Sequence, residues 1–184
     1  MALPKRFVGR TPLLPTRRQL KDALAAYREA RDRASTTGDW SIWAAVFTRD
    51  AHYIEHAYGE LHGREAICTW ITDVMAPYPH MTFPQDWVVF DEERGAVLFQ
   101  CQNRFPDPPG YNGPPLQFPN WTRLVYRDVH RDGDSTKNDA APDGYWRSEE
   151  DIYNPARDAP RVFTAWIDAG GQVLTAEQVG MKHR

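Results

Sequence analysis

Hydrophobic positions recur with helical spacing over the first part of the chain. Thr16 and Gln19 have the spacing of a capping box, in which each side chain satisfies a free backbone amide at a helix start. Apolar residues three and four positions apart follow, and they predict a helix that runs to about residue 36. Gly38 ends this helix, and Asp39 is a suitable N-cap for a second one. One side of that second helix would carry Trp40, Trp43, Ala44 and Phe47.

The next segments alternate between strand and helix patterns. Residues 51–58 are rich in β-forming residues, and they predict a strand that ends at Gly59. After Gly63 the apolar residues return to helical spacing, which predicts a third helix. Pro77 and Pro79 would end that helix.

Beyond this point the hydrophobic pattern alternates, as in strands. Residues 81–91 and 96–105 predict a hairpin, and residues 119–130 and 145–153 predict two further strands. Asn154 followed by proline predicts the start of a last helix, because Asn caps helices and proline is favoured at the first helical position. Helices followed by a run of antiparallel strands indicate an α+β domain. If the sheet is strongly curved and helices close one side, its mouth is a natural ligand site.

The predicted elements divide the chain into a proline-containing arm at 1–15, one domain at 16–168 and a tail at 169–184. A proline-rich segment at 106–119 is expected to cover the mouth of the domain as a lid. The polar segment 131–144 is expected to be an exposed hairpin loop.

Composition narrows the class of protein. The 184 residues are 41% hydrophobic and 26% charged, which is ordinary for one folded domain. The net charge of -3 and the absence of a Lys/Arg stripe argue against a nucleic-acid partner. No apolar run is long enough for a membrane span or a signal peptide, so we expect a soluble, cytoplasmic protein without a membrane partner. Cys68 and Cys101 are then expected to be buried free thiols.

Three short motifs resemble those of the nuclear transport factor 2 / SnoaL-like superfamily. They are Gly38-Asp39 before the aromatic helix, Asp50-Ala51 in the first strand, and Gly63-Arg64-Glu65 with Ile67 at the third helix. The order of elements also matches from about residue 16 to residue 166. The resemblance implies a cone-shaped, cystatin-like α+β fold, in which N-terminal helices close a curved antiparallel sheet around one small-molecule pocket. Superfamily members include isomerases, dehydratases, cyclases, epoxide hydrolases and non-catalytic binders.

The resemblance also suggests catalytic residues. Ketosteroid-isomerase relatives place a catalytic Asp three residues before the glycine that closes the first strand, and His56 stands at that distance from Gly59. Tyr27 resembles the tyrosine that these relatives use to polarise an oxygen. Asp151, three residues before Asn154, resembles an acidic pocket residue of the phenazine-biosynthesis branch. We therefore expect His56 to act as acid or base, since imidazole titrates near neutral pH, with Asp151 as its partner.

Further side chains are expected to bind the substrate. These are His52, Trp43, Asn103, Arg123 and Trp121. The alternation of a strand cannot decide which of Glu149, Glu150 and Asp151 faces the pocket, although Glu149 must share a face with Asp151. No metal is expected between His52 and His56, because four strand residues span about 13 Å. No phosphate-binding loop or nucleophile motif is present, so no cofactor is expected.

The sequence thus predicts a cofactor-independent acid–base enzyme of isomerase, dehydratase or cyclase type, acting on a small, largely apolar, cyclic or aromatic molecule. One alternative is a non-catalytic binding or dimeric assembly module of the same fold. Another is an epoxide hydrolase with an activated water, in which Arg123 and Asp151 could serve. Strands 96–105 and 119–130 carry apolar residues on both faces, which predicts a homodimer through the outer face of the sheet.

Overall fold

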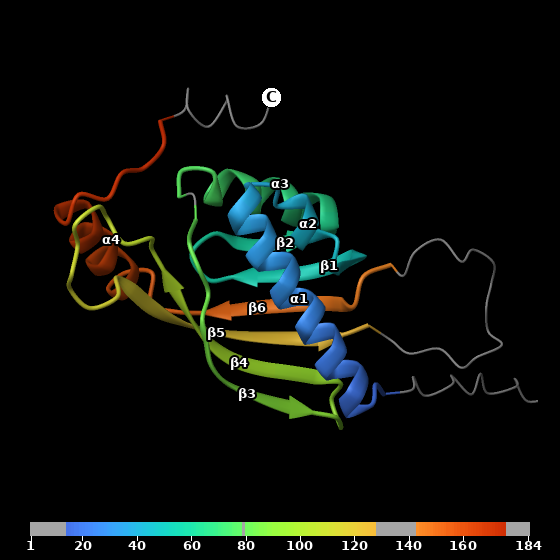
Figure 1. The fold of residues 1–184 in the computed structure, drawn as a ribbon. Coiled ribbons are helices and arrows are strands. Elements are labelled where there is room, and N and C mark those ends of the chain that lie inside the picture. Colours follow the sequence, from blue (N-terminus) through green and yellow to red (C-terminus); the bar gives the residue numbers. More distant parts are fainter. Residues whose placement is uncertain (1–13, 79, 128–142, 176–184) are drawn as a thin grey trace, which may run out of the picture.

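The computed structural model describes residues 14–78, 80–127 and 143–175. Within these residues, helices pack on one face of a six-stranded curved sheet and give an α+β domain (Figure 1). None of the described helices is both long and apolar enough to cross a membrane. The expected arm, the 131–144 loop and the expected C-terminal tail lie mostly outside the described residues.

Helix α1 (Arg17–Thr37) begins and ends as its sequence predicts. The backbone N–H of Thr16 donates to Gln19 Oε1 at 2.8 Å, and the backbone N–H of Gln19 donates to Thr16 Oγ1 at 3.3 Å. Gly38 adopts a left-handed conformation with φ of 79°, and its N–H donates to the Ala34 carbonyl at 2.7 Å. The capping box and this glycine therefore fix the length of the helix that spans the sheet (Figure 1).

Helix α2 (Ser41–Ala44) is shorter than predicted. Its N-cap is Trp40 and not the predicted Asp39, although Asp39 Oδ1 accepts the Ser41 backbone N–H at 3.1 Å. The prediction that Phe47 lies on this helix is wrong, because Phe47 opens strand β1 (Phe47–Glu55). The carbonyl of Val46 accepts the backbone N–H groups of Tyr145 and Trp146 at 2.7 and 3.1 Å, so pairing with a distant strand ends the helix.

Strand β1 ends earlier than predicted and turns into a second strand that the sequence analysis missed, β2 (Gly59–His62). The turn is held by Glu55, whose Oε2 accepts the backbone N–H groups of Ala57 at 2.6 Å and Tyr58 at 2.8 Å. The side chain of Glu55 thus stabilises the turn that joins β1 to β2 in a hairpin.

Helix α3 (Arg64–Met75) follows Gly63, which has a φ of 89°. The Gly63 N–H donates to the Ala51 carbonyl at 2.8 Å, and Arg64 Nε donates to the Phe47 carbonyl at 2.7 Å. The Gly-Arg pair thus fixes the start of α3 against strand β1.

The remaining elements are β3 (Gln85–Asp91), β4 (Ala96–Arg104), β5 (Gln117–Tyr126), β6 (Trp146–Ile152) and α4 (Asp158–Asp168). Helix α4 starts three residues after Pro155, and Asn154 Oδ1 caps the preceding turn by accepting the Arg157 backbone N–H at 2.9 Å. The strand order is β2-β1-β6-β5-β4-β3. All neighbours are antiparallel except β1 and β6, which pair in parallel and bring the first long strand beside the last.

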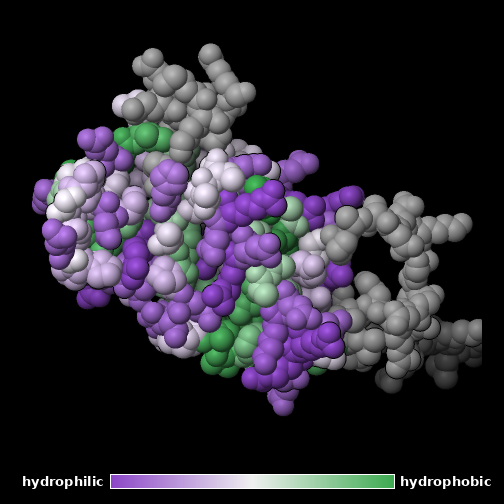
Figure 2. Space-filling view, viewed as in Figure 1, coloured by the Kyte–Doolittle hydropathy of each residue, from purple (hydrophilic) through white to green (hydrophobic). Residues whose placement is uncertain are grey.

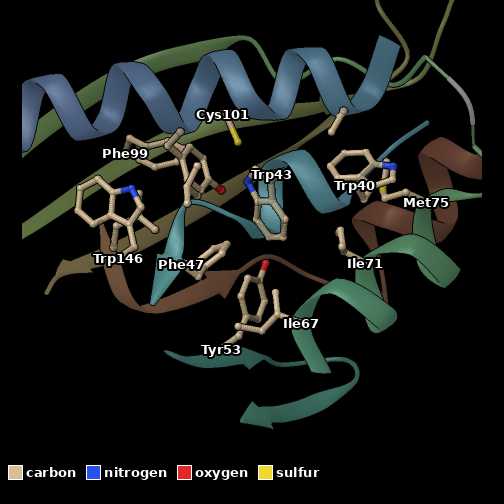
Figure 3. Packing of buried hydrophobic residues seen from close by; sticks show 14 of the residues in the cluster. Trp40, Trp43, Phe47, Tyr53, Ile67, Ile71, Met75, Phe99, Cys101 and Trp146 are labelled. Atoms are coloured by element: carbon tan, nitrogen blue, oxygen red, sulfur yellow. The ribbon is translucent and has the colours of Figure 1, made fainter. Parts of the chain in front are cut away.

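The core lies between the helices and the inner face of the sheet, and it is strongly aromatic. The rings of Trp43 and Phe47 meet edge to face with centroids 4.8 Å apart, and Tyr53 packs against both (Figure 3). Cys101 is buried and Cys68 is half-buried, and both are free thiols. The helix-covered side that faces the viewer is largely hydrophilic on its surface (Figure 2).

Candidate functional site

A cavity of about 430 Å³ lies in the core, between the helices and the concave face of the sheet. Aromatic rings supply much of its wall, including Trp40, Trp43, Trp70, Phe83, Phe105 and Phe118. All the carboxyl groups of the wall come from strands β1 and β6, and β5 adds Asn120 and Thr122. An apolar cavity of this size with a small group of convergent polar side chains is the usual form of a small-molecule site.

Asp151, at the end of β6, accepts three hydrogen bonds from side chains that line the cavity. Tyr53 donates to its Oδ2 at 2.5 Å, and Asn120 and Thr122 donate to its Oδ1 at 2.9 and 2.6 Å. Strand pairing creates this arrangement, because Asp151 lies directly opposite Thr122 on β5 and opposite Glu55 on β1. All three of these partners are donors, so both oxygens of Asp151 accept hydrogen bonds from the described residues.

Glu149 lies two residues earlier on the same face of β6, and its environment differs. The residue is 1% exposed, Tyr27 donates to its Oε1 at 2.8 Å, and its Oε2 has no hydrogen-bond partner among the described residues. Burial, and secondly the nearby Asp151 carboxylate, raise the pKa of Glu149 well above its ordinary value. Because Tyr27 donates to Oε1, a proton on this carboxyl group would lie on Oε2.

The tyrosines of the site are held in their protonated, hydrogen-bond-donating form. Burial raises the pKa of Tyr27 well above its ordinary value. Burial and the Asp151 carboxylate raise the pKa of Tyr53 in the same way. The cavity therefore combines hydroxyl donors with the carboxyl groups of Glu149 and Asp151 on β6, and the carboxyl group of Glu55 on β1 also lines it.

Arg31 is the one positively charged side chain among the described residues of the cavity wall. It is 5% exposed, and its guanidinium lies over the rings of Phe83 at 4.7 Å and Tyr27 at 5.3 Å. Its Nη2 donates to the Phe83 carbonyl at 3.1 Å. Its charge lowers the pKa of Glu149, and so partly opposes the larger effect of burial.

Four of the predicted site residues line the cavity. They are Tyr27, Trp43, Asn103 and Asp151. The remaining four, His52, His56, Arg123 and Trp121, are not among the lining residues. Trp121 is 44% exposed and packs edge to face against Trp87 on the outer face of the sheet, with ring centroids 5.1 Å apart.

The expected pairing of His56 with Asp151 is not formed. His56 Nε2 lies 3.2 Å from Glu150 Oε1, and Arg123 approaches the other oxygen of Glu150 at 3.8 Å. Glu150 faces away from the cavity, because it alternates with Glu149 and Asp151 along β6. His56, Glu150 and Arg123 thus form a partly exposed charged group outside the cavity.

Strand β1 does not direct His52, a predicted substrate-binding residue, into the cavity. His52 and Ile54 point to the outer face, whereas Tyr53 and Glu55 line the cavity. His52 contacts Glu60 of β2 instead, with Nε2 and Oε2 2.9 Å apart. Counting back from Gly59 failed because the chain has already left the strand at position 56.

The prediction also missed Tyr53, Glu55, Asn120 and Thr122 as cavity residues. For the pair on β5 a signal was present in the sequence. Phe118, Asn120, Thr122 and Leu124 alternate on one face, and all four are buried. Two polar residues within that alternation indicate a polar site in an otherwise apolar wall.

The sequence and the fold are both similar to those of known proteins. The family model of the SnoaL-like domain matches residues 17–134. No curated protein matches the chain in sequence. An NTF2-like protein from Anabaena variabilis has a similar structure, with a TM-score of 0.54 and 15% identity, over 82% of this chain and 98% of that one.

Two further solved structures share the fold. A protein from Jannaschia described as a SnoaL-like polyketide cyclase has a TM-score of 0.53 and 16% identity, over 85% of this chain and 95% of that one. TerC, crystallised with polyporic acid, has a TM-score of 0.54 and 11% identity, over 79% of this chain and 98% of that one. At such identities the similarity establishes the fold and leaves the chemistry to be argued from the cavity.

Proposed function

The chain belongs to the SnoaL-like domain family, and we propose that it is a cofactor-independent acid–base enzyme acting on a small, largely apolar, cyclic or aromatic molecule. The aromatic wall and the cavity volume of about 430 Å³ support a ligand of this kind. The polyporic acid bound to TerC and the polyketide cyclase name of the Jannaschia protein support the same class of ligand and chemistry.

The observation that carries the proposal is the contrast between two carboxyl groups on one strand face. Glu149 is buried with a raised pKa and one unpartnered oxygen, whereas Asp151 accepts hydrogen bonds from three donors. Two carboxyl groups on one face with such different surroundings can serve as an acid and a base. Glu149 is then the acid, and Asp151 is the base.

The proposed reaction begins with a substrate that carries a carbonyl group beside an acidic C–H bond. Asp151 takes the proton from carbon, and the bonding electrons move to the carbonyl oxygen. The Oε2–H of Glu149 donates to that oxygen and stabilises its developing charge, while Tyr27 holds Glu149 in place. The proton held by Asp151 goes to another carbon in isomerisation and to the departing hydroxyl group in dehydration, which releases water. In cyclisation the carbon attacks a second carbonyl, and the proton goes to the oxygen of that carbonyl.

Hydrogen exchange at carbon tests the first step without knowledge of the natural substrate. Cyclic and aromatic ketones, with 2-tetralone as the first, are screened for binding through the fluorescence of the tryptophans in the wall. For each ketone that binds, exchange of its α-hydrogens in D₂O is followed by proton NMR. We expect the protein to accelerate exchange, and Asp151→Asn to lose about a hundredfold to ten-thousandfold of that rate.

Glu150→Gln is the matched control, since Glu150 is the neighbouring acid on the opposite face of β6. It should leave the exchange rate unchanged. Ketones that bind in the cavity of the parent protein without accelerated exchange would favour a ligand carrier over an enzyme. Equal exchange rates for the parent and Asp151→Asn would rule out Asp151 as the base.

We also propose that the protein forms a homodimer through the uncovered face of its sheet. Val89, Trp121 and Ile152 are 53%, 44% and 46% exposed on that face. Trp121 and Ile152 lie directly opposite each other on β5 and β6, so they form one continuous apolar surface. A second copy of the chain would cover it through the same surface in both subunits.

A further inference from the structure

Three side chains with metal-binding atoms lie together on the outer face of the β1–β2 hairpin. His52 on β1 stands directly opposite His62 on β2, and Glu60 stands opposite Ile54. Residues directly opposite in a strand pair point to the same face, so all three side chains point away from the core. Tyr53, between His52 and Ile54, points to the cavity instead. This group is therefore separate from the candidate active site.

The donor atoms of the three side chains lie close enough to share one ion. His52 Nε2 is 2.9 Å from Glu60 Oε2, and His62 Nε2 is 4.0 Å from the same oxygen. One donor atom from each residue falls within 4.8 Å of the others. Ligands of a tetrahedral zinc ion lie about 3.3 Å apart, given metal–ligand bonds of about 2.0–2.2 Å. The side chains are 37%, 59% and 75% exposed, so small rotations that bring the donors together meet little resistance.

The imidazole rings are already arranged as a pair. Their centroids are 4.6 Å apart and their planes differ by only 5°. Both rings approach the same carboxylate oxygen of Glu60, His52 at 2.9 Å and His62 at 4.0 Å. A rotation of the exposed His62 ring about its side-chain bonds would direct both Nε2 atoms to one cation.

We propose that His52, Glu60 and His62 bind one divalent transition-metal ion, with zinc as the best candidate. Two imidazole nitrogens and one carboxylate oxygen suit zinc and similar first-row ions, and three protein ligands leave one position open for water. Calcium and magnesium are poor candidates, because they prefer all-oxygen sites.

The ion would join the edge strand β2 to β1. Strand β2 has four residues, and among the described strands it pairs with β1 alone. The turn between the two strands carries Glu55, which lines the cavity and accepts the backbone N–H groups of Ala57 and Tyr58. Metal binding on the outer face therefore stabilises the hairpin that positions this part of the cavity wall, without taking part in the proposed proton transfer.

Calorimetric titration of the untagged, chelator-treated full chain with zinc chloride tests the proposal. We expect saturable binding of one zinc ion per chain, and a rise in the unfolding temperature when zinc is present, because the ion binds only the folded hairpin. His62→Gln and Glu60→Gln should each weaken binding by about tenfold or more and remove most of the rise in unfolding temperature. Using both variants protects the test against a folding defect in either.

His56→Gln is the matched control, since His56 lies in the same hairpin but contacts Glu150. It should bind zinc as the parent does. The proposal is overturned if the parent shows no saturable zinc binding, if His62→Gln and Glu60→Gln both bind as tightly as the parent, or if the loss of binding follows His56 instead.

Discussion

Tyr27 and Glu149 are 122 residues apart in sequence, and a hydrogen bond of 2.8 Å joins them across the core. The bond connects the first helix to the last strand, and both residues are fully buried. It gives one oxygen of the Glu149 carboxyl group a partner, whereas the other oxygen has none among the described residues. The site and the packing of the core thus depend on the same contact.

Replacing Tyr27 with Phe should destabilise the fold. The change removes the only hydrogen bond that the described residues make to Glu149 Oε1, and it leaves a buried oxygen without a partner. We expect the free energy of unfolding, measured in urea, to fall by about 1–3 kcal/mol. Tyr111→Phe is the control, because its hydroxyl bonds the Pro114 carbonyl at an exposed position, and it should change stability by less than about 0.5 kcal/mol. A similar loss in both variants would argue against a special role for the Tyr27–Glu149 bond.

Glu149 should make stability depend on pH in a predictable direction. Its pKa is raised in the folded state, so the folded protein holds a proton that the unfolded chain releases above its ordinary value of 4.5. The stabilisation of the folded state by this bound proton is fully present below pH 4.5. It is lost as pH rises toward the folded-state pKa, at up to about 1.4 kcal/mol per pH unit.

Glu149→Gln removes this titration and keeps an oxygen for Tyr27. The stability of the parent relative to the variant should therefore decline steadily above pH 4.5. Urea unfolding of both proteins between about pH 4 and pH 8 measures the difference. Glu150→Gln, on the outer face, should follow the parent curve. Parallel curves for the parent and Glu149→Gln would mean that Glu149 is not held as a neutral acid.

Elements with local signals were predictable from the sequence. The capping box at Thr16, the glycine at 38 and the apolar spacing of α3 each depend on neighbours within a few residues. The alternation in β3 and β4 is equally local, and that hairpin was predicted within a few residues at each end. Such signals fix element type and approximate length.

The inward face of β1 was not predictable, because a distant strand decides it. His52 and Ile54 form as plausible an inner face as Tyr53 and Glu55, and the choice is made by parallel pairing with β6, where Tyr53 meets Glu149. The sequence also does not distinguish a buried glutamate from a solvent-exposed one. The acids of the site therefore became identifiable only once the strands were placed together.

The dimer proposal predicts a specific loss of association. At micromolar concentration, light scattering should give the mass of two chains for the parent protein. Trp121→Asp places a charge at the centre of the exposed apolar surface and should give a single-chain mass. Ile167→Asp, at a residue of α4 that is 39% exposed and away from the sheet, should remain dimeric. If light scattering gives a single-chain mass for the parent protein, the homodimer proposal is wrong.

Glu149 and Asp151 should act as one unit in proton transfer. Glu149→Gln removes the acid that stabilises the developing oxygen charge, and Asp151→Asn removes the base, so each change alone should abolish most of the accelerated exchange of a bound ketone. The double variant should then be little worse than either single variant, because residues that serve the same step lose their benefits together. Ketone affinity, followed by tryptophan fluorescence, should stay within a few-fold of the parent, since the aromatic wall is unchanged. Exchange-rate losses that multiply in the double variant would mean that the two carboxyl groups contribute independently, and the assignment of acid and base to this pair would fail.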